Sequence, residues 1–313
     1  DGDGNKDTFS IELSGSNEEL WTLSIQDAAG TVVRNFDVEN GEPKTLIWDG
    51  KNNSDQIVPD GVYRFVAHSR DRALNETTAQ LDNIIVNTEQ PLVNILVNDP
   101  WFSPNGDGVK DLLTLYPSVP VTSGVTGWKL QILDNRDSVQ KTIEGSRPVP
   151  AEIVFDGKDS AGSRLPEGSY RGRLSVEYQN GSVPTAVSPV FTLDVTAPTA
   201  QVKTAYNAFS PNGDSIQDTM IFEQTASPEW LWTGEIRRAG SSATSTPAKT
   251  FRFEGSVPEK LEWNGRTDQG ALSPDGVYEY ALKAMDRAGN SGTSAPVSFE
   301  LSTADTPLLV TVN

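Results

Sequence analysis

The sequence has no cysteine and only one histidine, His68. Without cysteine there is no disulfide framework, no thiolate zinc site and no thiol nucleophile. A single histidine excludes metal sites built from several histidines and acid–base pairs of two histidines. Basic residues are also few, with 25 Lys and Arg against 43 Asp and Glu, and the net charge is −18. This balance argues against binding to nucleic acid or to an anionic membrane surface, whereas divalent cations remain possible ligands.

Long apolar runs are also missing from the sequence. No stretch reaches the ~18 apolar residues that a transmembrane helix needs. The apolar fraction of 36% is low for one large core in 313 residues, which favours two or three small domains. The chain begins at Asp1 without a methionine or a signal peptide, and we therefore expect it to be a processed or excised piece. The lack of cysteine is compatible with an oxidising, extracytoplasmic location.

A block of residues recurs three times along the chain. Each copy has an aromatic residue, an Asx-Gly turn, a later proline and acidic-Gly turn, and a tyrosine. The copies begin Trp48-Asp49-Gly50-Lys51, Phe155-Asp156-Gly157-Lys158 and Trp263-Asn264-Gly265-Arg266, and they end Pro59-Asp60-Gly61-Val62-Tyr63, Pro166-Glu167-Gly168-Ser169-Tyr170 and Pro274-Asp275-Gly276-Val277-Tyr278. A period of about 107 residues predicts tandem domains.

We place these domains by aligning the copies. The boundaries are 1–89 for the first repeat, 90–197 for the second and 198–305 for the third. The first repeat lacks its first strand in this alignment. Residues 306–313 align with the first strand of a further repeat, so we expect the chain to come from a longer array.

The second repeat consists of short β-type runs separated by Gly, Pro, Asn and Asp clusters, and no window indicates an amphipathic helix. Seven runs in about 105 residues predict an immunoglobulin-like sandwich. The expected strands are 92–98, 112–117, 127–134, 138–143, 150–155, 169–178 and 187–195. The tyrosine after each acidic-Gly turn is expected to bond back to the backbone as a tyrosine corner. The predicted fold class is all-β, with three tandem immunoglobulin/fibronectin-III-like β-sandwiches in an elongated array.

Two motifs resemble known bacterial domains. The third copy of the recurring block, followed by Asp286-Arg287-Ala288-Gly289-Asn290, resembles the immunoglobulin-like domain of flagellar hook-capping proteins. Phe102-Ser103-Pro104-Asn105-Gly106-Asp107-Gly108 resembles the leader motif of gliding-motility-associated surface domains. These resemblances cover nearly the whole chain and imply the immunoglobulin-like fold. They imply function only by class, because such domains serve as spacers, adhesive modules and assembly scaffolds.

An acidic loop in each repeat is the strongest candidate for a ligand site. Oxygen-bearing side chains at alternate positions, with glycines between them, are typical of loops that bind calcium. The expected metal ligands are Asp1, Asp3 and Asp7 in the first repeat, Asn105, Asp107 and Asp111 in the second, and Asn212, Asp214 and Asp218 in the third. The EF-hand pattern is not met, because no glutamate follows at position twelve. The alternative is an Asx-rich turn whose side chains only satisfy its own backbone.

The expected sandwich topology places this acidic loop at the end of the repeat that faces the next repeat. The loop before the sixth strand is expected at the same end, where it could supply further oxygens. In the second repeat the candidates are Asp156, Asp159 and Glu167.

Tryptophans that occupy equivalent positions in the repeats are expected in the cores. They are Trp21, Trp128 and Trp232, together with Trp48 and Trp263. Trp101 and Trp230 do not recur; packing is the expected role for them, and an adhesive contact is the alternative. His68 lies beside Ser69, but neighbours on a strand point to opposite faces, which argues against a catalytic triad.

These observations favour a non-catalytic segment over an enzyme. We expect an extracytoplasmic bacterial stalk or spacer of immunoglobulin-like repeats, stiffened by calcium and linked to other domains of a longer repeat protein. One alternative is an adhesin whose repeats bind a host protein or glycan. Another is an assembly scaffold of a surface filament, similar to a flagellar hook cap, with envelope components as partners. Binding to nucleic acid and direct membrane insertion are not expected.

Overall fold

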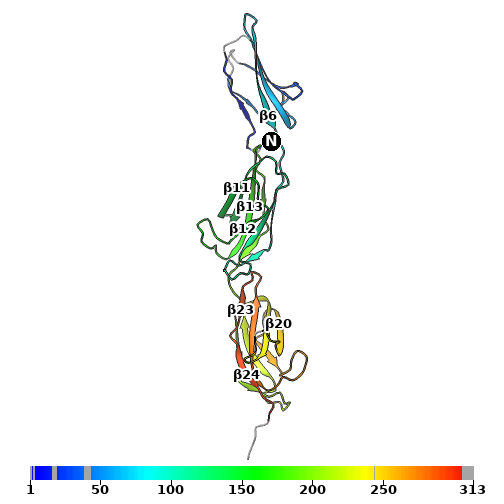
Figure 1. The fold of residues 1–313 in the computed structure, drawn as a ribbon, viewed down its shortest axis with the longest axis vertical. Helices are drawn as coiled ribbons and strands as arrows, with labels where there is room; N and C mark the ends of the chain where they lie inside the picture. Colours follow the sequence, from blue (N-terminus) through cyan, green and yellow to red (C-terminus); the bar gives the residue numbers. More distant parts are fainter. Residues whose placement is uncertain (1, 3, 16–19, 39–43, 243, 305–313) are drawn as a thin grey trace, which may run out of the picture.

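The computed structural model of the chain describes all residues except 1, 3, 16–19, 39–43, 243 and 305–313. Three β-sandwiches follow one another end to end (Figure 1), and Lys6 lies at the junction between the first and second sandwiches. The described residues contain strands and turns but no helix. Accordingly, none of them forms a helix long and apolar enough to cross a membrane. The strand expected in 306–313 lies outside the described residues.

The second sandwich shows the complete topology. One of its sheets has the order β12 (Ile153–Phe155), β9 (Leu113–Ser118), β7 (Asn94–Val97). The other has the order β11 (Val139–Ser146), β10 (Val125–Leu133), β13 (Gly168–Tyr178), β15 (Phe191–Leu193), β8 (Trp101–Phe102), and β14 (Thr185–Val187) also pairs with β13. The all-β immunoglobulin-like prediction is therefore confirmed.

The third sandwich repeats this order. Its sheets are β16 (Ala200–Thr204), β18 (Met220–Ala226), β21 (Lys260–Trp263), and β17 (Ala208–Phe209), β24 (Val297–Leu301), β22 (Gly276–Met285), β19 (Glu229–Arg238), β20 (Lys249–Gly255), with β23 (Ser291–Thr293) on β22. The described part of the first sandwich has β1 (Phe9–Ile11) with β4 (Leu46–Trp48), and the sheet β3 (Val32–Phe36), β2 (Leu20–Gln26), β5 (Gly61–Arg70), β6 (Glu76–Val86).

One of the seven strands expected in the second repeat is divided in the structure, and one further short strand was not expected. The strand expected at 92–98 is β7, and a separate short strand, β8, follows it and pairs in parallel with β15 in the opposite sheet. The strand expected at 187–195 is split into β14 and β15. Pro100 precedes β8 and Pro189 separates β14 from β15. Since proline has no N–H for a strand ladder, both breaks fall where pairing cannot continue.

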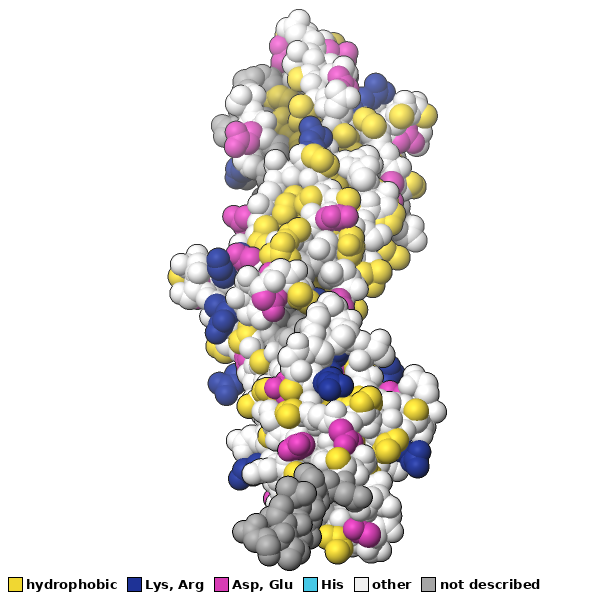
Figure 2. All heavy atoms as spheres, turned by 60° about the horizontal axis from the view of Figure 1, so that its bottom comes forward, with side chains coloured by type: hydrophobic (Ala, Val, Ile, Leu, Met, Phe, Trp, Pro, Cys, Tyr) yellow, Lys and Arg dark blue, Asp and Glu magenta, His cyan; other side chains and the backbone are white. Residues whose placement is uncertain are grey.

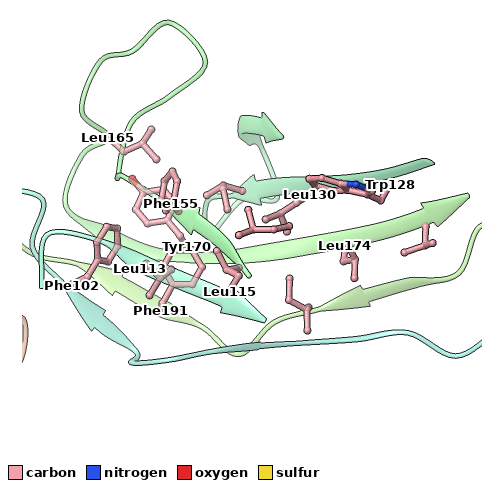
Figure 3. Packing of buried hydrophobic residues seen from close by; sticks show 14 of the residues in the cluster. Phe102, Leu113, Leu115, Trp128, Leu130, Phe155, Leu165, Tyr170, Leu174 and Phe191 are labelled. Carbon is pink, nitrogen blue, oxygen red and sulfur yellow. The ribbon is translucent and has the colours of Figure 1, made fainter. Parts of the chain in front are cut away.

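The core of the second sandwich lies between its two sheets (Figure 3). Phe102, Phe155 and Phe191 are each at most 1% exposed, and their ring centroids lie 5.8 to 6.2 Å apart. Tyr170 stacks on Phe191 at 6.3 Å, and its hydroxyl donates to the carbonyl of Pro166 at 2.7 Å. Tyr63 and Tyr278 donate in the same way to Pro59 and Pro274, which confirms the tyrosine corner in all three repeats.

The recurring tryptophans are core residues, as expected. Trp48 and Trp263 are 2% exposed, Trp232 is fully buried and Trp128 is 9% exposed. Trp21 is half-buried against the core of the first sandwich. His68 lies on β5, with Nε2 3.7 Å from a carboxylate oxygen of Glu76 on the adjacent strand.

Candidate functional site: the junctions between repeats

The acidic loops have the same internal geometry in every repeat. In the second repeat, the two carboxylate oxygens of Asp111 accept the backbone N–H groups of Gly106 and Gly108, at 2.6 and 2.8 Å. Asp107 accepts the N–H of Val109 at 2.8 Å. Asp7 closes the first loop through Gly2 and Gly4, and Asp218 closes the third through Gly213 and Ser215. Each loop is thus folded around a carboxylate by its own amides.

The side chains that are expected to bind calcium form hydrogen bonds within the loop. Asn105 and Asp107 are also hydrogen-bonded to each other, with the Asn105 carboxamide donating to the Asp107 carboxylate at 3.0 Å. No three acidic or histidine side chains among the described residues are arranged to hold a metal ion. Asp1 and Asp3 lie outside the described residues. The contacts are those of Asx-type turns, and calcium binding by these loops stays a prediction.

The loop before the sixth strand lies against the acidic loop of its own repeat, as expected. Gly157 packs against Pro104 so closely that a Cβ at position 157 would lie 2.6 Å from the proline ring. Its acidic residues, however, have other partners. Asp156 pairs with Lys141 at 2.9 Å, and Asp159 accepts the N–H groups of Ala161 and Ser163 within its own turn.

The acidic residue of each Pro-Asp/Glu-Gly turn holds the segment that leads to the next repeat. Glu167 accepts the N–H of Val195 at 2.9 Å and the hydroxyl of Thr196 at 2.7 Å. These bonds hold the pKa of Glu167 below its ordinary value, and the bond from Thr196 has the largest effect. The equivalent pairs are Asp60 with Thr88 and Asp275 with Thr303. This carboxylate–threonine clasp fixes the exit of the chain from each sandwich.

Asn290 is the centre of the junction between the second and third repeats, and it is 2% exposed. Its carbonyl oxygen Oδ1 accepts the hydroxyl of Ser103 at 2.6 Å and the carboxamide of Asn105 at 3.0 Å. Its own Nδ2 donates to the backbone carbonyl of Asp194 at 3.0 Å and to Asp286 at 2.8 Å. One side chain therefore joins the acidic loop of the second repeat, the linker and the turn of the third repeat.

Lys110 and Val109 complete this junction. The Lys110 ammonium donates to the backbone carbonyl of Arg287 at 2.8 Å and pairs with Asp99 at 2.9 Å. Val109 covers Gly289, where a Cβ would lie 2.7 Å from the valine methyl group. Gly289 has a φ of +95°, a conformation that glycine adopts easily. The turn 286–290 is thus shaped to receive the acidic loop.

The junction between the first and second repeats is built in the same way. Lys6, the counterpart of Lys110, donates to the backbone carbonyl of Gln179 at 2.8 Å. Gly181, the counterpart of Gly289, also has a φ of +95°, and a Cβ there would lie 2.9 Å from the carbonyl oxygen of Asn5. The Asn180 carboxamide donates to the linker carbonyl of Glu89 at 3.0 Å. The two junctions therefore share the lysine and glycine contacts although their sequences differ.

Three carboxylates lie near one another at the second junction. Burial raises the pKa of Asp194, and the nearby carboxylates of Asp286 and Glu167 act in the same direction. Elsewhere, acidic and basic side chains are interspersed with apolar ones on the face in Figure 2.

Trp101 lies beside the same junction, with the Arg287 guanidinium 5.7 Å from its ring centroid. Trp230 lines a groove with these two residues and is 70% exposed, so packing does not account for it.

The sequence indicated some of these residues and not others. The acidic loop was identified, and its position at the end facing the next repeat is confirmed by its contacts with Asn290 and Arg287. The linker threonines and the receiving role of Asn290 were missed. The recurrence of Asp71–Asn75 as 286–290 was a usable signal, but a repeated turn does not reveal what packs on it.

The first repeat matches the model of a known domain family. Residues 1–72 match the FlgD Ig-like domain. This match confirms the resemblance to the hook-capping immunoglobulin-like domain in the first repeat. The resemblance of the Phe102–Gly108 motif to gliding-motility-associated domains stays a prediction. No curated protein matches the chain.

Several solved structures are similar to the chain at low identity. A tetra-tandem repeat from the extending region of a large adhesion protein is 16% identical, with 96% of this chain and 72% of that chain covered and a TM-score of 0.34. A structure of a 1.5-MDa bacterial ice-binding adhesin is 13% identical, with 94% and 90% covered and a TM-score of 0.36. The FN1–FN3 domains of chicken CNTN1 are 12% identical, with 94% of each chain covered and a TM-score of 0.33.

Proposed function

We propose that the chain is a non-catalytic spacer of immunoglobulin-like repeats, located outside the cytoplasm, whose junctions hold neighbouring repeats in a fixed head-to-tail orientation. The observation that carries this proposal is the recurrence of one junction design. In both junctions a lysine of the acidic loop binds a backbone carbonyl of the next repeat, at 2.8 Å in each case. A chain of freely hinged domains has no need of such contacts.

The location and the origin rest on the sequence. The match of residues 1–72 to the FlgD Ig-like domain favours a bacterial protein that acts outside the cytoplasm, and the absence of cysteine is compatible with this. Other domains of a longer repeat protein are the expected covalent partners. The lack of catalysis is part of the proposal, and panels of glycosidase, esterase and protease substrates should give no turnover above background. Turnover that Asp107→Ala abolishes would contradict it.

The orientation of the repeats can be tested by electron paramagnetic distance measurement, because a cysteine-free chain accepts two spin labels without background. Val154 on β12 and Val277 on β22 are 53% and 47% exposed and serve as the label sites after Val→Cys substitution. We expect a narrow distance distribution that Lys110→Met broadens, because the variant loses the bonds to Arg287 and Asp99.

A matched control is Lys129→Met. Lys129 lies on β10, and its ion pair is with Glu144 of the same hairpin at 3.9 Å. This variant should leave the distribution narrow. A distribution that is already broad in the unmodified chain, or that Lys110→Met does not change, would contradict a fixed junction.

A second function, adhesion to a host protein or glycan, is favoured by one observation. Trp230 is 70% exposed and Met285, in the same groove, is 56% exposed. Exposed aromatic side chains are enriched in binding sites. Binding to a glycan array or to host matrix proteins that Trp230→Ala removes, with the spin-label distances unchanged, would establish this function.

A further inference from the structure

The turn Asp71–Asn75 of the first repeat corresponds to the turn Asp286–Asn290 that receives the acidic loop in the third. In both turns the asparagine N–H and carboxamide donate to the two oxygens of the aspartate. The distances are 2.8 and 2.8 Å for Asn75 to Asp71, and 2.9 and 2.8 Å for Asn290 to Asp286. The orientation that Asn290 needs for its role in the junction is therefore already present at Asn75.

The two asparagines differ in what covers them. Asn290 is 2% exposed because the acidic loop of the second repeat lies on it, whereas Asn75 is exposed. Among the described residues, none donates a hydrogen bond to Oδ1 of Asn75, the atom that at Asn290 accepts Ser103 and Asn105. The hydrogen bond from the Asn75 carboxamide lowers the pKa of Asp71, so the ionised carboxylate and the oriented carboxamide stabilise each other.

The complementary surface is present at the other end of the chain. The third acidic loop has Ser210 and Asn212 where the second has Ser103 and Asn105. The backbone bonds that fold it are the same, from Ser210 N–H to the Gln217 carbonyl at 3.0 Å and from Asn212 N–H to the Ser210 carbonyl at 2.8 Å. Ile216 stands in the place of Val109 and is 70% exposed, against 40% for Val109.

We propose that the Asp71–Asn75 turn is a docking surface for the acidic Ser-Pro-Asn-Gly-Asp loop of another repeat of this type, and that the third repeat of a second copy of this chain presents such a loop. Ser210 and Asn212 would donate to Asn75 Oδ1, as Ser103 and Asn105 donate to Asn290. The contact is head to tail, so it extends the array and does not close it. The proposal deepens the spacer function, because it names the surface and the partner that would continue the array.

Two substitutions change the fit of this interface. Gln217 stands in the place of Lys110, so the third loop has no ammonium group for the bond that Lys110 makes to Arg287. The other substitution is at Leu74. Leu74, with a φ of +68° and 71% exposure, occupies the place of Gly289, which Val109 covers closely. A leucine there cannot be covered at the same distance, so the side chain at the Val109 position, here Ile216, must turn aside. Ile216 and Leu74, both exposed in the single chain, would then contact each other and remove apolar surface from water.

Thiol cross-linking between full-length chains tests the proposal, and it benefits from a sequence without cysteine. Two single-cysteine variants, Ile216→Cys and Leu74→Cys, are mixed and treated with a short bis-maleimide. The net charge of −18 opposes association, so the salt concentration is raised to screen it. Mass spectrometry then separates the mixed 216–74 product from the 216–216 and 74–74 products, which serve as internal controls for random collision.

We expect the mixed product to exceed its statistical share severalfold. Asn75→Ala in the Leu74→Cys chain should remove this excess, whereas Thr78→Ala, an exposed change on β6 of the same repeat, should retain it. Products in statistical proportion, or an excess that Asn75→Ala leaves intact, would overturn the proposal. Such a result would not affect the spin-label test of the internal junctions, so failure of the docking surface is distinguishable from failure of the spacer function.

Discussion

At the scale of single residues, the acidic loops depend on positions with positive φ. The second such position in each loop is a glycine in the first two repeats, Gly4 and Gly108, each with a φ of +88°. In the third repeat the same position is Ser215, with a φ of +71°. Left-handed backbone conformations are unfavourable for residues with a Cβ and unstrained for glycine. The third loop therefore folds like the others in spite of its sequence.

Reciprocal exchanges at this position test that reasoning. Ser215→Gly should raise the stability of the third repeat by about 1 kcal/mol, and Gly108→Ser should lower that of the second by a similar amount. The measurement is denaturant unfolding followed by tryptophan fluorescence, with each change assigned to one repeat by hydrogen exchange. Equal stability in both exchanges would show that the loop relaxes around a serine without strain.

The clasp between Glu167 and Thr196 makes a second prediction at the residue scale. The bonds from Thr196 and Val195 lower the pKa of Glu167 from its ordinary value of 4.5 in the folded state. A carboxylate with a lowered folded pKa contributes stability above its unfolded pKa and loses it as pH falls through the folded value. The clasp should therefore be intact above about pH 4.5 and weaken at lower pH.

Glu167→Gln removes this titration. We expect the variant to be less stable than the unmodified chain at neutral pH, and the difference to shrink as the pH falls below about 4.5. Thermal unfolding across the pH range measures it. Glu152→Gln, at an exposed carboxylate of the same repeat, is the control and should change stability little. A constant deficit for Glu167→Gln would mean that its ionisation is not linked to folding.

At the scale of strands and loops, the sequence was sufficient where the signal is local. Alternating apolar residues predicted the strands, and the tyrosine corner followed from a turn and a tyrosine at fixed spacing. The short strand β8, which follows β7 and joins the other sheet, was missed, because a change of sheet depends on which strand lies opposite. The role of Asn290 was missed for the same reason, since its partners Ser103 and Asn105 are distant in sequence and come from another repeat.

The calcium hypothesis belongs to this scale, since it concerns whole loops. If calcium binds only the folded chain, it should raise stability by ~2.7 kcal/mol at a hundredfold excess over its dissociation constant. Thermal unfolding and calorimetry in calcium and in chelator measure this for the unmodified chain and for Asp107→Ala combined with Asp214→Ala. The double variant should lose the calcium effect in the second and third repeats. Equal melting temperatures in calcium and chelator for the unmodified chain would leave the loops as Asx turns closed by their own amides.

At the scale of the whole molecule, the same clasp and loop contacts recur at successive junctions. The acidic residue before the sixth strand holds the outgoing linker, and the acidic loop at the same end binds the turn of the next repeat. Each junction is therefore restrained on two sides. The same rule therefore orients both pairs of repeats in the chain, whereas the third loop has Gln217 in the place of Lys110 and would lack the lysine bond.

This rule predicts an extended particle in solution. A strand of ~10 residues spans about 33 Å, so three sandwiches placed end to end as in Figure 1 should reach a maximum dimension on the order of 100 Å. Small-angle scattering measures this dimension at low protein concentration, where the net charge of −18 keeps the chains apart. Lys110→Met should shorten the mean dimension, because loss of the bond to Arg287 allows the third repeat to bend, while Lys129→Met should not. A compact particle for the unmodified chain, with the repeats folded back on one another, would contradict both the fixed junctions and the spacer function.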